Sequence, residues 1–170
     1  MPLGEVKRFP RNPKQHDLGL LHRSLSRFGF VNPLIVNEAT GELLAGHGRL
    51  DTLEQRKAEG KPPPSGIEAR DGEWLVPVVR GVSLKGKEAE AFSVADNQTT
   101  IIGGWSEQAL ADILQEIDLD GVGFDAEDLE RLLQDLQGPD LGPELDERIA
   151  EGMALCVCEK CGNEHARVRK

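Results

Sequence analysis

Apolar residues in the first half of the chain recur in patterns that change from helical to extended. The helical spacing of Leu18, Leu21, Leu25 and Phe28, followed by Gly29, predicts a helix from about residue 17 to 28. Two short β-prone runs, 34–36 and 43–45, flank a turn at 39–41 and predict a pair of strands. The second run leads directly into Gly46-His47-Gly48-Arg49, and an amphipathic stretch at 50–58 then predicts another helix, closed by Gly60.

The second half begins with extended residues and continues with helices. We expect a strand over 75–79, with Pro77 at an edge or a start, and then a helix capped by Ser83 that ends near 96–98. Leu-rich patterns after Ser106 and Asp125 predict two more helices, the second ending at Gly138. The fold class is therefore α+β. We divide the chain into a compact domain with a small mixed sheet (1–104), an acidic helical extension (105–137), a linker (138–152) and a cysteine-containing tail (153–170).

Charge is distributed unevenly along the chain, and this affects which segments could bind phosphate-containing partners. The formal net charge is −10, but 105–152 holds 15 acidic against 2 basic residues, whereas 1–60 holds 7 acidic against 9 basic ones. The N-terminal part and the tail are therefore free to meet phosphate, and 105–152 would repel it. No signal peptide or apolar run long enough for a membrane span is visible, so we expect a soluble, cytoplasmic protein.

The turn at 46–49 carries the chemistry with most promise. A glycine-flanked turn that begins a helix offers unpaired N–H groups and the positive end of the helix dipole to phosphate. Arg49 adds a planar donor, and His47 could donate to phosphate, ligate a metal or act as an acid or base. The plain alternative is a tight turn with a surface arginine and an incidental histidine, because short glycine motifs are weak evidence.

The order of several short motifs resembles a known family. These motifs are Asn12-Pro13-Lys14-Gln15, Phe28-Gly29-Phe30, Asn32-Pro33-Leu34-Ile35-Val36, Ala45-Gly46-His47-Gly48-Arg49, Val76-Pro77-Val78-Val79 and Ala95-Asp96-Asn97-Gln98. In this order they resemble the ParB N-terminal-like domain, which shares its fold with sulfiredoxin. The resemblance covers about residues 5–137 and is closest to a phage and mobile-element subgroup associated with DNA methyltransferases, in which a Gly-Trp step, here Gly104-Trp105, precedes a Leu-rich helix.

The resemblance implies a site and ligands. Gly46, His47, Gly48 and Arg49 would hold nucleotide phosphates, with Asp96 and Asn97 opposite them. The implied cofactor is CTP or ATP with Mg²⁺, and the implied partner is DNA, met directly or through a DNA methyltransferase; a homodimer stays open. On the residues alone, Asp96 and Asn97 could simply end a helix.

Departures from the family pattern leave the activity open. The turn has no cysteine for sulfiredoxin chemistry, and Gly48 and Thr99-Thr100 replace arginines of the chromosome-segregation proteins. Three functions remain. The first is a nucleotide- or phosphate-binding module in DNA modification, regulation or maintenance. The second is a metal-dependent nuclease, NTPase or phosphotransferase with His47 as catalytic residue, and the third is a protein-interaction adaptor with a vestigial site. We assign no role to His16 or His22, and expect Phe92 and Trp105 in the core.

The cysteines lie only in the tail. Cys158-Glu159-Lys160-Cys161-Gly162 is typical of a zinc-knuckle turn, and Cys156 and His165 could complete four ligands. The single residue between Cys156 and Cys158 is cramped for tetrahedral ligation by both. A zinc site, local or shared between chains, and a tail without metal are both compatible with this spacing.

Overall fold

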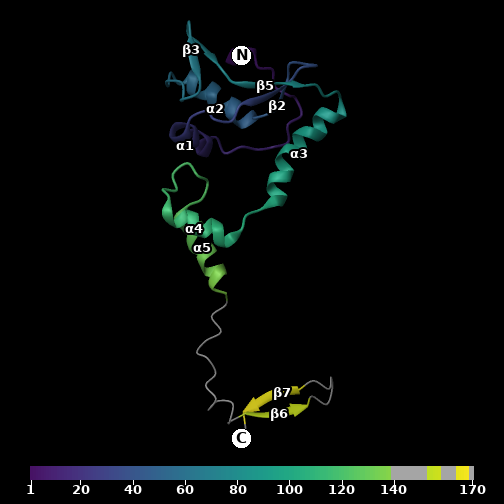
Figure 1. Ribbon diagram of the computed structural model, residues 1–170, viewed down its shortest axis with the longest axis vertical. Helices are drawn as coiled ribbons and strands as arrows, with labels where there is room; N and C mark the ends of the chain where they lie inside the picture. The colour runs from purple at the N-terminus through teal and green to yellow at the C-terminus, as the bar shows by residue number, and fades with distance from the viewer. Residues whose placement is uncertain (139–152, 158–163, 169–170) are drawn as a thin grey trace. The chain divides into compact units, whose positions relative to one another are not determined.

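The computed structural model describes residues 1–138, 153–157 and 164–168, with side chains described up to residue 138. The chain divides into two compact units, Met1–Leu133 and Gln134–Lys170. The predicted α+β class is confirmed: helices and small sheets both occur, and one sheet is mixed (Figure 1). No helix among the described residues is both long and apolar enough to cross a membrane. The domain boundaries at 104, 137 and 152 stay predictions.

The mixed sheet carries the residues that lead into the 46–49 turn. Its strands are β1 (Leu34–Asn37), β2 (Leu43–Ala45) and β5 (Val78–Val82), in the order β2-β1-β5. β1 is antiparallel to β2 and parallel to β5. Leu34 and Leu43 are fully buried, so these short apolar runs are stabilised by packing on the core.

Helices α1 and α2 lie side by side, and α2 packs against β1 of this sheet (Figure 1). α1 (Leu18–Phe28) begins where the Asp17 side chain accepts a hydrogen bond from the Leu20 N–H at 2.9 Å, and it ends at Gly29 with φ 78°. α2 (His47–Ala58) starts directly after β2 and buries Leu50 and Leu53 completely. Both helices were predicted, because their caps and apolar spacing are local signals.

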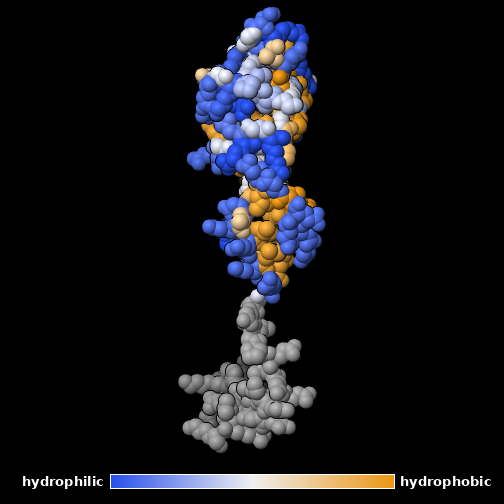
Figure 2. All heavy atoms as spheres, turned by 90° about the vertical axis from the view of Figure 1, so that its left-hand side faces the viewer, coloured by the Kyte–Doolittle hydropathy of each residue, from blue (hydrophilic) through white to orange (hydrophobic). Residues whose placement is uncertain are grey.

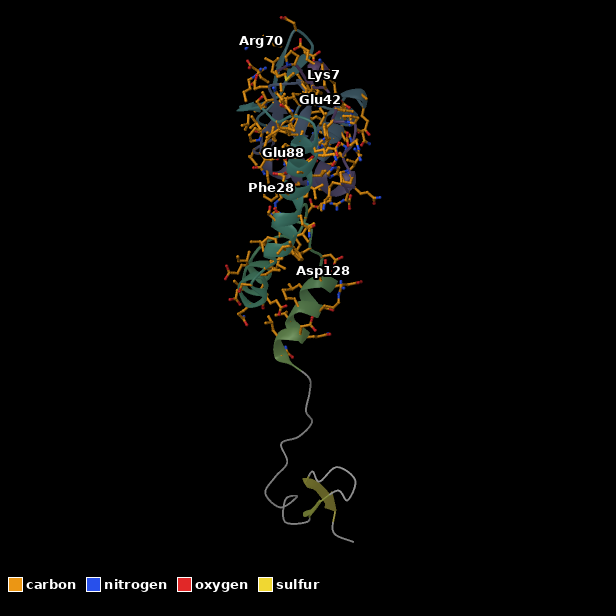
Figure 3. All side chains as sticks on the ribbon, turned by 90° about the vertical axis from the view of Figure 1, so that its right-hand side faces the viewer. Lys7, Phe28, Glu42, Arg70, Glu88 and Asp128 are labelled. Carbon is orange, nitrogen blue, oxygen red and sulfur yellow. The ribbon has the colours of Figure 1, made fainter. Side chains whose placement is uncertain are left out.

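The N-terminal residues complete the core of the first unit. After the short helix η1 (Leu3–Glu5), Leu3 and Val6 are buried, and Met1 exchanges backbone hydrogen bonds with Val76. The backbone of Lys7 forms a parallel β-bridge with that of Glu42, the residue before β2, and Figure 3 labels both residues.

The strand predicted over 75–79 is wrong as a single element. β4 (Glu73–Leu75) pairs with β3 (Glu68–Arg70) in a hairpin whose turn residues, Asp71 and Gly72, both have positive φ. β5 belongs to the other sheet. Pro77 lies between them and has no N–H for a ladder, which explains why the strand divides here.

Three helices follow the small sheets: α3 (Lys87–Gly103), α4 (Glu107–Glu116) and α5 (Ala126–Gln137), the last of which crosses the boundary between the two units after Leu133. α3 begins after Gly86, so the predicted Ser83 cap is wrong. Trp105 is also not a core residue, since 72% of it is exposed, and its ring packs edge-to-face against Phe124 at 6.1 Å. Figure 2 shows a hydrophobic stripe between hydrophilic surfaces on the helices that precede the grey residues.

The second unit contains a β-hairpin. β6 (Met153–Val157) and β7 (Glu164–Val168) are antiparallel, with Cys156 directly opposite His165 in the register. The other two predicted zinc ligands, Cys158 and Cys161, lie outside the described residues, as does the predicted linker from residue 139 onward.

Candidate functional site

The 46–49 turn forms the uncapped N-terminus of α2. Gly46 is the N-cap residue in a left-handed conformation, with φ 100° and ψ 23°, and it supplies no side-chain cap. The first intrahelical bond runs from the Leu50 N–H to the Gly46 carbonyl at 3.0 Å. The N–H groups of the first turn therefore have no helical acceptor, and the helix dipole makes this end favourable for an anion.

Both glycines are required by close packing. A Cβ on Gly46 would lie 2.6 Å from Cδ2 of Leu34 and 2.9 Å from Nη2 of Arg49. A Cβ on Gly48 would lie 2.7 Å from Cγ of His16 and 2.7 Å from Cδ1 of Leu21. The lack of a side chain at these glycines leaves room for a ligand, as the sequence indicated. It also leaves room for the neighbouring side chains of the protein itself.

Asp96 and Asn97 lie in the same pockets as the turn. A pocket of about 190 Å³ is lined by the whole turn together with Asn12, His16, Asp96 and Asn97. A neighbouring pocket of about 490 Å³ shares Arg49, Asp96 and Asn97 and adds Lys14 from the N-terminal segment. Six predicted site residues, far apart in the sequence, are therefore brought together by contact between α3 and β2.

The alternative in which Asp96 and Asn97 end a helix is wrong. α3 continues through both residues to Gly103. Asn97 donates through Nδ2 to the Ser93 carbonyl of its own helix at 2.9 Å, which leaves its side-chain oxygen as an acceptor or metal ligand. Asp96 is exposed and supplies the pocket's carboxylate.

Arg49 is positioned to bind from within the pocket. Its Nη2 donates to the Pro33 carbonyl at 3.2 Å, whereas its Nε is buried with no hydrogen-bond partner. Burial lowers the pKa of Arg49, and the charge of Asp96 opposes that shift. The guanidinium stays charged at neutral pH. A fixed cation with free donors at a helix N-terminus is suited to phosphate oxygens.

His16 is the site residue that the sequence did not reveal. It lines the pocket beside His47, and Nε2 of each ring is buried without a hydrogen-bond partner. Burial is the main cause that lowers the pKa of both histidines, and the charge of His16 lowers the pKa of His47 further. Both rings are therefore neutral at neutral pH and can act as acceptors, metal ligands or bases. The only sequence signal was the position of His16 just before the cap of α1.

The N-terminal segment is fastened to the helices that carry the site. Arg8 forms ion pairs with Asp51 and Glu54 of α2, and its hydrogen bond with Asp51 is the main cause that raises the pKa of Arg8. Arg11 pairs with Glu90 of α3 at 2.9 Å. These contacts hold Asn12, Lys14 and His16 over the turn, although exposed ion pairs of this kind are individually weak.

No protein-family model matches the chain. Over 64 residues the chain is 34% identical to the ParB-like nuclease domain-containing protein YnaK of Escherichia coli (strain K12), an alignment that covers 36% of this chain and 72% of that protein. The chain therefore belongs to the ParB-like family.

Proposed function

We propose that this chain is a ParB-like module that binds a nucleotide, CTP or ATP, through its phosphates and acts in DNA modification, regulation or maintenance. The observation that supports this most is the shared pocket in which an uncapped helix N-terminus and Arg49 face Asp96 and Asn97. One carboxylate and one amide fit a Mg²⁺ ion that also takes ligands from nucleotide phosphates. We further propose that DNA is met directly or through a partner such as a DNA methyltransferase, as in the phage and mobile-element subgroup.

A thermal-unfolding screen tests the proposal. CTP, ATP, GTP and their diphosphates, each with and without Mg²⁺, are added to the wild-type chain, to Arg49→Ala and to Arg80→Ala. Arg80 is an exposed residue of β5 that pairs with Glu38 and lines none of the site's pockets. We expect one nucleotide to stabilise wild type and Arg80→Ala, by about 2.7 kcal/mol at a hundredfold excess over Kd. Arg49→Ala should lose this stabilisation. No shift with any nucleotide would overturn the proposal.

A second function is a nuclease that uses the same pocket. The name of the relative in Escherichia coli and the neutral pair His16 and His47 favour it. No group of three or more histidine, cysteine, aspartate or glutamate side chains suited to a metal occurs among the described residues, so a divalent ion would need ligands from the DNA phosphates. Cleavage of duplex DNA is measured for the wild type and for His47→Gln, with and without a divalent metal. Metal-dependent cleavage by the wild type that His47→Gln abolishes would favour the nuclease over the binding module.

We also propose that the tail binds zinc through Cys156, Cys158, Cys161 and His165. The pairing of Cys156 with His165 across the β6–β7 hairpin supports this, because it joins the first and last of the four at neighbouring backbone positions. Elemental analysis of the purified chain should find about one zinc per chain, as expected for a four-ligand site, and much less in Cys161→Ser. Equal and negligible zinc in both proteins would refute the site.

A further inference from the structure

A second basic pocket lies at the opposite end of α2 from the glycine turn. It is open to solvent and has a volume of about 540 Å³. Arg56 and Lys61 from the end of α2 and the following loop line it together with His22, Arg23 and Arg27 of α1. Asp120 is its only acidic lining residue. The chain as a whole has a net charge of −10. This pocket differs from that overall acidity, because four basic residues and one acidic residue line it.

Arg56 is a buried cation without a counter-charge. It is only 9% exposed, and among the described residues no carboxylate forms an ion pair with it. Its Nη1 donates to the Ser26 hydroxyl at 2.8 Å and its Nη2 to the Pro62 carbonyl at 3.4 Å, while Nε is buried without a partner. Neutral acceptors do not balance a buried charge, so an anion at this position would be favourable.

The neighbouring cations are held in place but remain accessible. Arg23 is 55% exposed and approaches Asp120 through Nε at 3.4 Å, which leaves its terminal nitrogens free of that contact. Lys61 is 52% exposed and pairs with Glu59 at the end of α2. Arg27 donates to the carbonyl oxygens of Asp118 and Asp120 at 2.7 and 2.5 Å, and its Nη1 lies 3.7 Å from the Asp118 carboxylate. The pocket therefore presents fixed guanidinium groups and one ammonium to the same volume.

This pocket is separate from the proposed nucleotide site. The two share no lining residue. Arg56 lies nine residues after His47 on α2, which places the two about 13 Å apart along the helix axis. We infer that the Arg23–Arg56–Lys61 pocket is a second anion site that binds a phosphate group. Planar guanidinium groups match phosphate oxygens, and a phosphate would supply the counter-charge that Arg56 lacks. This inference does not depend on nucleotide binding at the turn.

Inorganic phosphate is the probe that tests the inference. Thermal unfolding of the full chain is measured with increasing phosphate at constant ionic strength, set with chloride. The main variant is Arg23→Ala/Lys61→Ala, whose residues are exposed and leave Arg56 in place. The matched control is Arg70→Ala/Arg80→Ala, which removes two exposed basic side chains that each have one carboxylate partner. Phosphate also stabilises proteins in general because it is excluded from the protein surface. This general stabilisation should be equal in both variants.

We expect phosphate to raise the unfolding temperature of the wild type and of the matched control equally, and at least half of this shift to be lost in Arg23→Ala/Lys61→Ala. Arg56→Lys, which keeps the charge but loses the fork, should also show a smaller shift. Binding of a short DNA duplex shows whether the phosphate group belongs to DNA or to a free ligand. Weaker DNA binding only in the pocket variant identifies a phosphate of the DNA backbone. Unchanged DNA binding identifies a free phosphate. An equal phosphate shift in the pocket variant and its control would overturn the inference.

Discussion

Replacing Gly46 by alanine is expected to lower the free energy of unfolding by about 2–4 kcal/mol, from the cost of a left-handed residue and of overpacking. The residue has φ 100°, and its Cβ would lie 2.6 Å from Cδ2 of Leu34, which is fully buried. The same Cβ would displace Arg49, which lies 2.9 Å away. We therefore expect the variant also to lose the stabilisation by nucleotide. Urea unfolding with and without nucleotide measures both effects.

Gly60 provides a matched control for Gly46. It also has a positive φ, 69°, and it follows the same helix, but a Cβ there would meet nothing within 4 Å. Gly60→Ala should therefore cost about 1 kcal/mol, the conformational part alone. It should keep the response to nucleotide. Equal losses in the two variants would show that the contact with Leu34 does not constrain the turn.

The parts of the fold that the sequence predicted depend on signals close together in the chain. α1 has a cap residue, Asp17, and a C-terminal glycine within thirteen positions, and α2 follows a strand through a glycine turn. Such features report backbone geometry locally. The same holds for α5, where Asp125 and Asp128 exchange side-chain-to-backbone hydrogen bonds across the first turn.

The features that the sequence did not predict correctly depend on contacts between distant segments of the chain. His16 enters the site because a loop passes over Gly48, and no periodicity in the sequence reports where a loop crosses a helix. Trp105 has the composition of a core residue, but α3 and α4 leave its ring largely uncovered. The true start of α3 at Lys87 was missed because Ser83 is the stronger local cap signal, and tertiary contacts of the preceding residues override it.

One of these tertiary contacts is Asn37, a buried polar residue that fastens the segment before α3. Asn37 is 1% exposed. Its Nδ2 donates to the Leu84 carbonyl at 2.8 Å, and its Oδ1 accepts from the N–H groups of Leu84 at 3.2 Å and Ala39 at 3.1 Å. Leu84 lies three residues before α3, the helix that carries Asp96 and Asn97. Asn37 therefore links the end of β1 to the acidic side of the candidate site.

Asn37→Ala is expected to lower the free energy of unfolding by about 3 kcal/mol, because three backbone groups lose a partner and each buried one costs about 1–3 kcal/mol, partly relieved by water. Thr99→Ala is the control, since it removes one exposed side-chain hydrogen bond within α3 and should change stability by less than about 0.5 kcal/mol. If Asn37 holds the start of α3 in place, its variant should also need more nucleotide to reach a given stabilisation, at a temperature where it is fully folded. A destabilised variant with unchanged nucleotide affinity would show that the position of Asp96 and Asn97 does not depend on this link.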